Sequence, residues 1–277
     1  MASVFEQMVS KYTIQTQDDK LNAYHEVMQE VILSALQRAG FFNKAAFYGG
    51  TCLRIFYKLP RFSEDMDFSL LQTENNFSLE PYFDAIVKEF KALGREVIIN
   101  KKVKKNFTHV ESAFLKDTTE IYNIEFKTER TVKIKIEVDT TPPLGFATEN
   151  KLLLLPYSFM TLCYTLPNLY AGKMHAMLFR NWKHRVKGRD WYDFEWYIRN
   201  NYKLNFDHLK IRALQNGYSN NEEFTIEVFK TLLREKIKNT KINLVINDVK
   251  PFIKNTSELE IWSTDYFLQL VDMIQFE

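Results

Sequence analysis

The sequence predicts an α/β protein, with a mixed β-sheet and helices in the N-terminal half and a helical bundle in the C-terminal half. Strand-like runs rich in β-branched and aromatic residues alternate with helical patterns before residue 140, whereas leucine and aromatic residues recur at helical spacing after residue 157. The 8 glycines and 7 prolines among 277 residues are too few for a barrel or sandwich with many tight turns. We therefore expect two domains, residues 1–150 and 151–277.

The N-terminal half is expected to begin with an amphipathic helix at 19–39, which Gly40 ends, and a short buried strand at Ala45–Tyr48, which Gly49 and Gly50 end. After these we expect helices at 51–58 and 79–93 and strands at 65–70, 97–103, 108–115, 121–126 and 132–138. In the C-terminal half the periodicity predicts helices near 157–166, 169–182, 190–199, 222–238 and 257–275.

Composition excludes several classes of protein. Lys plus Arg (37) nearly balance Asp plus Glu (35), so a site for a polyanion must be local. Residues 1–15 do not resemble a signal peptide, and the longest apolar run, Leu152–Leu155, is too short to span a bilayer. Cys52 and Cys163 have apolar neighbours and are expected to be reduced thiols of a cytoplasmic protein. The histidines lack the spacing of a zinc site.

Two aspartates, Asp65 and Asp67, are the sharpest chemical feature. Strand side chains alternate, so the two carboxylates share one face while Met66 and Phe68 point into a core. Two neighbouring carboxylates repel each other unless a cation lies between them, and Mg²⁺ with its waters and phosphate ligands suits such a pair. The alternative is a solvated strand edge with two unrelated acids.

A glycine turn precedes this pair. Gly49 and Gly50 allow close approach of the backbone to a phosphate, and the helix beginning at Thr51 would direct its N–H groups there. A third carboxylate is expected on the alternating strand around residue 137. Either Glu137 or Asp139 lies on its polar face and could ligate the metal or accept a proton.

The densest positive stretch lies further along the chain. Lys173 and Arg180 have helical spacing, and Lys183, Arg185, Lys187 and Arg189 follow. A lysine there suits a triphosphate, and Asp193 could pair with Lys173 or Arg180 and orient it, whereas Asp190 suits a helix cap. Lysines 101, 102, 104 and 105 form a second cluster, which either attracts a polyanion such as RNA or protects a strand edge. Two aromatic clusters, 191–197 and 266–267, are expected in the core.

These motifs resemble those of the AbiEii/AbiGii-type nucleotidyltransferase toxins of the polymerase-β-like superfamily. The first motif is Gly49-Gly50-Thr51-x-Leu53-Arg54 with Arg61-x-Ser63-x-Asp65-x-Asp67-Phe68, and the second is Ile134-Lys135-Ile136-Glu137-Val138. The third is Lys173-x-x-Ala176-x-x-x-Arg180 followed by Lys187-Gly188-Arg189-Asp190-x-x-Asp193. A weaker fourth match, Asn247-Asp248-Val249, is also an ordinary helix-end turn.

The resemblance implies a polymerase-β-like fold and NMP transfer from an NTP to an acceptor hydroxyl. It favours Glu137 over Asp139 and makes Lys173 and Asp193 site residues. By the residues and the resemblance together, Asp65 and Asp67 would bind Mg²⁺, and the nucleotide would contact Gly49, Gly50, Thr51, Arg61, Ser63, Lys173 and Arg180. Family members are toxins with a separately encoded antitoxin, and some modify tRNA ends.

Two other functions remain open at this point. A small-molecule acceptor, as in antibiotic-modifying relatives, would keep the chemistry and change the substrate. A non-catalytic module that holds an NTP or a partner on the same fold would have no need of the acids Asp65 and Asp67 together with Lys173 and Asp193, so their presence disfavours it.

Overall fold

The computed structural model describes residues 3–101, 119–126, 132–180, 186–215, 218 and 223–277. It divides into two compact units. Unit 1 comprises residues 1–57, 63–142 and 148–163, and unit 2 comprises residues 58–62, 143–147 and 164–277. The chain therefore enters unit 2 briefly at Lys58–Phe62, immediately before the segment that carries Asp65 and Asp67.

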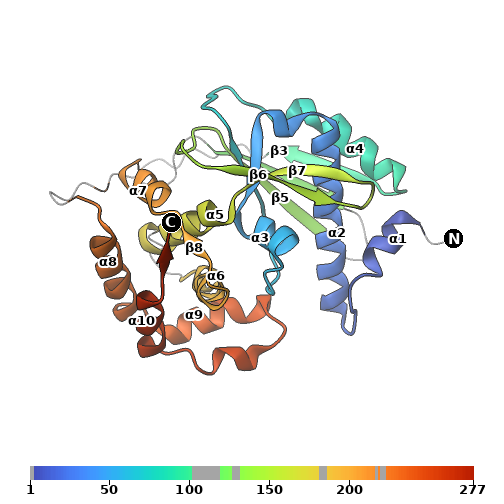
Figure 1. The fold of residues 1–277 in the computed structure, drawn as a ribbon. Coiled ribbons are helices and arrows are strands. Elements are labelled where there is room, and N and C mark those ends of the chain that lie inside the picture. Colours follow the sequence, from blue (N-terminus) through green and yellow to red (C-terminus); the bar gives the residue numbers. More distant parts are fainter. Residues whose placement is uncertain (1–2, 102–118, 127–131, 181–185, 216–217, 219–222) are drawn as a thin grey trace, which may run out of the picture. The chain divides into compact units, whose positions relative to one another are not determined.

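The described residues of unit 1 form a seven-stranded mixed sheet (Figure 1). The strand order is β3-β4-β5-β2-β1-β7-β6, with β2 parallel to β5, β1 parallel to β7, and β1 antiparallel to β2. The strands are β1 Ala45–Tyr48, β2 Met66–Leu70, β3 Val97–Lys101, β4 Thr119–Phe126, β5 Val132–Asp139, β6 Thr148–Leu153 and β7 Phe159–Tyr164.

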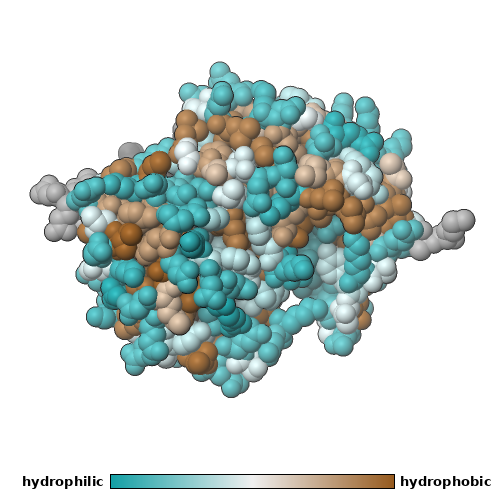
Figure 2. All heavy atoms as spheres, in the orientation of Figure 1, coloured by the Kyte–Doolittle hydropathy of each residue, from teal (hydrophilic) through white to brown (hydrophobic). Residues whose placement is uncertain are grey.

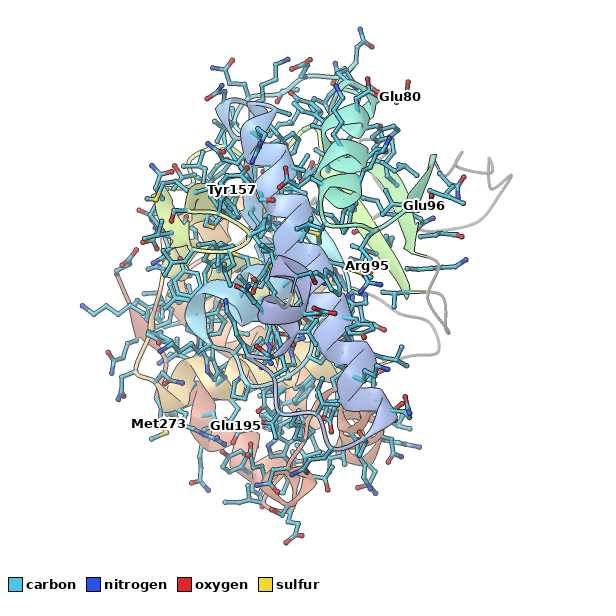
Figure 3. All side chains as sticks on the ribbon, turned by 90° about the vertical axis from the view of Figure 1, so that its right-hand side faces the viewer. Glu80, Arg95, Glu96, Tyr157, Glu195 and Met273 are labelled. Atoms are coloured by element: carbon cyan, nitrogen blue, oxygen red, sulfur yellow. The ribbon has the colours of Figure 1, made fainter. Side chains whose placement is uncertain are left out.

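Helices α2 (Gln17–Arg38) and α4 (Phe83–Ala92) lie side by side on the sheet (Figure 3). A capping box starts α2, because Thr16 and Asp19 exchange side-chain and backbone hydrogen bonds. The shorter helices of unit 1 are α1 Val4–Val9, η1 Phe41–Asn43, α3 Gly49–Tyr57 and η2 Glu80–Tyr82.

The core of unit 1 follows from the alternation of its central strands. In β2 and β5, Met66, Phe68, Ile134, Ile136 and Val138 are all fully buried. The intervening side chains, which include Asp67, Lys135 and Glu137, are part-exposed. Since side chains of a strand alternate between its two faces, the apolar set forms the core and the charged set occupies the opposite face.

Unit 2 is mainly helical. Its elements are α5 Leu166–Phe179, α6 Gly188–Arg199, α7 Phe206–Gln215, α8 Ile226–Lys238, α9 Ile242–Val249, η3 Lys250–Phe252, η4 Thr256–Leu259, α10 Thr264–Asp272 and the small parallel pair β8 Lys203–Leu204 and β9 Gln275–Phe276. Aromatic residues fill its core: the rings of Trp191 and Trp262 lie 4.9 and 5.0 Å from that of Phe267. Glu195 is also buried and accepts hydrogen bonds from Trp262, Tyr266 and Arg199.

The predicted fold class is confirmed, and the aromatic clusters at 191–197 and 266–267 do contribute to the core: Trp191, Phe194, Tyr197 and Phe267 are buried. The helix predicted at 157–166 is wrong, because Phe159–Tyr164 forms β7. The sheet also extends past the expected boundary at residue 150, since β6 and almost all of β7 belong to unit 1. The strand predicted at 108–115 lies outside the described residues.

The face shown in Figure 2 is mainly hydrophilic, with separate rather than continuous hydrophobic patches. Among the residues that the structure describes, no helix is long and apolar enough to cross a membrane. Cys52 and Cys163 are both buried free thiols.

Gly188 tests the packing of α6 on α9. A Cβ atom there would overlap the carbonyl oxygen of Val245 and lie 3.0 Å from the backbone nitrogen of Val249. Gly188→Ala should therefore lower the free energy of unfolding by about 1–3 kcal/mol. Gly172→Ala is the matched control in α5, because its Cβ would meet nothing nearer than Arg212 Cζ at 3.9 Å. It should stabilise the protein by about 0.5–1 kcal/mol. Equal urea midpoints for the two variants would refute the packing argument.

Candidate active site

Three acids lie together on one face of the unit 1 sheet. Asp67 is the second residue of β2, and Asp65 immediately precedes the first residue of β2, where continued strand alternation would direct its side chain to the same face. In the parallel pairing of β2 with β5, Asp67 lies directly opposite Glu137. We call Asp65, Asp67 and Glu137 the carboxylate face.

The strand register distinguishes the two candidates for the third carboxylate. Asp139 lies opposite Ser69, one pair further along the same face than Glu137. Its Oδ1 accepts a hydrogen bond from the backbone N–H of Thr141, at 3.1 Å, in the turn that follows β5. The register therefore favours Glu137 as the companion of Asp67.

Gly49 allows the start of α3 to lie against this face. Its φ is +82°, a conformation that favours glycine, and a Cβ atom there would collide with the Asp67 carboxylate. Asp67 thus lies at the N-terminus of α3, where the helix dipole and the first N–H groups favour negative charge. The Asp67 carboxylate therefore lies beside this turn, and the predicted contact of Gly49 and Gly50 with a phosphate stays a prediction.

Buried side chains hold the segment that carries Asp65 in place through hydrogen bonds. Thr51, fully buried, forms hydrogen bonds with the Asp65 carbonyl and with the Ser63 hydroxyl, the latter at 3.0 Å. From α2, Gln29 Nε2 donates to the carbonyls of Ser63 and Glu64 at 3.1 and 2.9 Å. Thr51 and Ser63 therefore act here as positioning residues for Asp65, and a nucleotide contact from their side chains stays a prediction.

Lys135 lies on the same face of β5 and forms an ion pair with Glu137. Burial alone would lower the pKa of Lys135. The hydrogen bond with Glu137 and the charges of Glu137, Asp65 and Asp67 outweigh burial and raise the pKa above its ordinary value. The ammonium thus lies within the field of all three acids, a role that the alternating pattern around residue 135 had not suggested.

The donor set fits a hard divalent cation that arrives with a substrate. No three His, Cys, Asp or Glu side chains within the described ranges form a preformed metal cluster. Mg²⁺ commonly binds through one or two carboxylates and takes water and substrate phosphates as its other ligands. Asp65 and Asp67 could supply those protein ligands.

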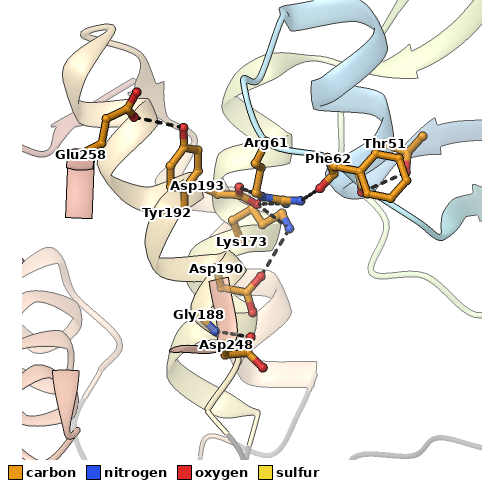
Figure 4. Close-up of polar contacts among 11 residues, drawn as sticks. Thr51, Arg61, Phe62, Lys173, Gly188, Asp190, Tyr192, Asp193, Asp248 and Glu258 are labelled. Carbon is orange, nitrogen blue, oxygen red and sulfur yellow. Dashed lines mark hydrogen bonds and ion pairs between the residues drawn. The ribbon is translucent and has the colours of Figure 1, made fainter. Parts of the chain in front are cut away.

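Within unit 2, a buried network of charges joins Arg61, Lys173 and Asp193 (Figure 4). Arg61 Nε and Nη2 donate to the two Asp193 oxygens at 2.6 and 2.7 Å, and Lys173 Nζ lies 2.7 Å from Asp193 Oδ2. Asp193 and Arg61 are 0% and 1% exposed. Burial alone would raise the pKa of Asp193, but the charges and hydrogen bonds of Arg61 and Lys173 hold it below the ordinary value.

This network corrects part of the sequence interpretation. Of the two partners predicted for Asp193, Lys173 or Arg180, the structure shows Lys173, and Asp190 also contacts Lys173, at 3.3 Å. The second partner of Asp193 is Arg61, which had been assigned to the nucleotide. In this structure the Arg61 side chain is buried against Asp193, so its nucleotide contact stays a prediction.

The start of α6 is capped from a distant helix. Gly188, the first residue of α6, donates its backbone N–H to Asp248 Oδ2 at 2.8 Å (Figure 4). An anionic acceptor at a helix N-terminus satisfies an otherwise unpaired donor and suits the helix dipole. This contact gives Asp248, whose role was open, a structural function, and local sequence carried no signal for it.

Cationic side chains gather where α5 ends and α6 begins. Burial lowers the pKa of Lys187, and the charges of Arg180, Lys173 and Arg189 lower it further, whereas Asp190 opposes them. Arg180 is exposed and, as the C-cap, lies just beyond α5 rather than on the helical face shared with Lys173. We call Lys173, Arg180, Lys187 and Arg189 the cationic cluster. Lys183 and Arg185 lie outside the described residues.

The buried network predicts an acid dependence of stability. The folded pKa of Asp193 is below its ordinary 3.8, so its ionised form stabilises the fold fully above that value, and this stabilisation is lost as pH falls through the folded pKa. Asp193→Asn should cost about 3–5 kcal/mol at pH 7, because Arg61 stays buried and charged. Urea unfolding should show the gap between wild type and variant narrowing below pH 4.

Asp190→Asn is the control, since Asp190 contacts Lys173 at the longer distance of 3.3 Å and should cost less. A pH-independent gap between wild type and Asp193→Asn would contradict the electrostatic explanation.

A family model and several solved structures resemble this chain. The model described as "Nucleotidyl transferase AbiEii toxin, Type IV TA system" matches residues 31–270. The comparison with curated proteins gave no match.

Among solved structures, JHP933 from Helicobacter pylori is 17% identical with a TM-score of 0.53, covering 94% of this chain and 91% of that chain. A candidate nucleotidyltransferase from H. pylori is 17% identical with a TM-score of 0.50, covering 94% of both chains. MenT4, a nucleotidyltransferase toxin from Mycobacterium tuberculosis H37Rv, is 12% identical with a TM-score of 0.49, covering 97% of this chain and 98% of that chain.

At these identities, the first two structures show a shared fold. The family match spans most of the sequence and includes Asp65, Asp67, Glu137, Lys173 and Asp193. This chain therefore belongs to the AbiEii family of nucleotidyl transferase toxins of type IV toxin–antitoxin systems.

Proposed function

We propose that this protein is a Mg²⁺-dependent enzyme that transfers NMP from an NTP to a hydroxyl group of RNA, with tRNA as the preferred acceptor. In this proposal it acts as a toxin with a separately encoded antitoxin. The observation that carries the proposal is the carboxylate face, which puts Glu137 opposite Asp67 across paired parallel strands. Family membership supports nucleotidyl transfer in general.

In this proposal the acceptor oxygen attacks the α-phosphorus of the NTP, a new P–O bond forms, and the bond to pyrophosphate breaks. Asp65 and Asp67 would hold Mg²⁺, which supplies positive charge to the reacting phosphate. Glu137 would complete the ligand set or accept the hydroxyl proton. The carboxylates thus act by charge and by position, as is general for transfers at phosphorus.

The cationic cluster would bind the leaving pyrophosphate in this proposal. Lys173 is the member held in place by acids, at 2.7 Å from Asp193 and 3.3 Å from Asp190, and its side chain is 15% exposed. Such a lysine presents a fixed point charge to a phosphate. Arg180 is exposed and would give a second, supporting contact.

The RNA acceptor rests on local positive charge in a chain whose net charge is only +2. Local patches allow binding at one site without indiscriminate binding of polyanions. Besides the cationic cluster, the lysines at 101, 102, 104 and 105 support this choice. Lys101 ends β3, and the other three lie outside the described residues. A small-molecule acceptor is the alternative within the same chemistry.

Substitutions on the carboxylate face should separate its members. Asp65→Asn, Asp67→Asn and Glu137→Gln should each lower NMP transfer by roughly 10²–10⁴-fold, and they should fold normally because they relieve like-charge repulsion. Asp139→Asn is the matched control, since Asp139 lies on the same strand face opposite Ser69. Single-turnover transfer rates measure the effect. Full activity of Asp67→Asn, or loss only in Asp139→Asn, would overturn the assignment.

Lys173→Ala should cost on the order of 2–3 kcal/mol of nucleotide binding or of the transfer barrier, through loss of a charge-assisted phosphate contact. Lys210→Ala is the control in the same unit, because Lys210 pairs with the exposed Glu223 and should leave activity unchanged. Unfolding curves separate the kinetic effect from the loss of the Asp193 ion pair. Unchanged NTP affinity and turnover in Lys173→Ala would exclude the contact.

The salt dependence of acceptor binding distinguishes an RNA acceptor from a small molecule. If several lysines and arginines meet phosphates, the affinity for RNA should fall with a log–log slope of about −0.7 to −0.9 per contact. Changing Lys101, Lys102, Lys104 and Lys105 to Gln should make the slope shallower. A flat response, or labelling of an aminoglycoside while no RNA is labelled, would favour the small-molecule alternative.

A further inference from the structure

The carboxylate face contains a cation of its own. Lys135 precedes Glu137 by two residues on β5, so its side chain shares the face of the acids, and it forms an ion pair with Glu137. Asp67 is directly opposite Glu137 in the parallel pairing of β2 with β5, so the Lys135–Glu137 ion pair lies beside Asp67. The Lys135 side chain is 33% exposed, so its interaction with the acids is partly shielded from water.

We propose that Lys135 is the built-in counter-ion of the metal site: its ammonium neutralises the carboxylate face in the metal-free protein and competes with a divalent cation for it. The inference rests on the proposed function, because it takes the carboxylate face as the metal site. Lys135 acts here as a positioning residue, since it contacts Glu137 and is given no contact with the substrate.

The physical reason is like-charge repulsion. Three carboxylates on one face destabilise each other unless positive charge is near. A divalent ion with a nucleotide supplies that charge during the reaction, and Lys135 supplies it before the metal arrives. Lys135 therefore keeps the face assembled without metal and raises the metal concentration needed to occupy it, because an ion must displace the Lys135–Glu137 pair to reach Glu137.

Lys133 offers a matched control. It lies two residues earlier on β5, on the same face, but pairs with Glu125 at 2.9 Å, and its side chain is 62% exposed. Lys133→Met and Lys135→Met thus remove the same charge from the same strand face. Only Lys135→Met removes it from the neighbourhood of the acids, and Lys135→Arg retains it there.

The test uses the full chain with Mn²⁺ alone as probe, measured as free ion by electron paramagnetic resonance, together with thermal melting in EDTA and in saturating Mn²⁺. Lys135→Met should bind Mn²⁺ about tenfold more tightly than wild type, melt lower in EDTA, and regain most of the difference in Mn²⁺. Lys133→Met and Lys135→Arg should stay within about twofold of wild type.

Two results would overturn the counter-ion role. Mn²⁺ affinity and EDTA melting in Lys135→Met equal to those of Lys133→Met would show that Lys135 does not neutralise the acids. Weaker Mn²⁺ binding in Lys135→Met would show that it assists the metal instead of competing. Asp67→Asn separates this failure from that of the proposed function. If it weakens Mn²⁺ binding while Lys135→Met has no effect, the metal site stands and only the counter-ion fails; if it binds Mn²⁺ as wild type does, both fail.

Discussion

The main physical constraint on unit 1 is the repulsion between negative charges on one face of its sheet. The pairing of β2 with β5 brings Asp67 and Glu137 opposite each other, and Asp65 immediately precedes β2. Each nearby feature limits the cost of this arrangement. Gly49 admits the Asp67 carboxylate to the N-terminus of α3, and Lys135 places an ammonium beside Glu137. The buried hydrogen bonds of Thr51 and Gln29 hold the segment that carries Asp65.

In unit 2 the central acid of the charge network, Asp193, is fully buried, unlike the part-exposed acids of the carboxylate face. Asp193 is tolerable there only because Arg61 and Lys173 neutralise it and because both of its oxygens accept hydrogen bonds. The network has a geometric consequence for the lysine. Lys173 is held by Asp193 and Asp190, so its ammonium has a defined position and loses little conformational freedom on meeting an anion. A fixed lysine of this kind suits phosphate binding better than a freely moving one.

Local sequence patterns predicted the parts of the protein that follow from local rules. Alternation was sufficient to separate the buried Met66 and Phe68 from the part-exposed Asp67, and periodicity located α2, α4 and α6. It failed for Phe159–Tyr164, because an almost continuous apolar run in a buried strand resembles a short helix. The Arg61–Asp193 pair joins residues far apart in the chain, and the close approach of Gly188 to α9 is purely tertiary. No window of the sequence contains either signal. Lys135 was within the recognised pattern, but only the structure shows its ion pair with Glu137.

The central claim is that the carboxylate face supports transfer of the α-phosphate of an NTP. The most direct measurement incubates the protein and Mg²⁺ with total RNA and each NTP in turn, labelled either at the α- or at the γ-phosphate. The account predicts that α-label from at least one NTP enters an RNA acceptor, that γ-label is released as pyrophosphate, and that Asp67→Asn abolishes both. Transfer of γ-label to the acceptor, or α-label transfer that persists in Asp67→Asn, would contradict it.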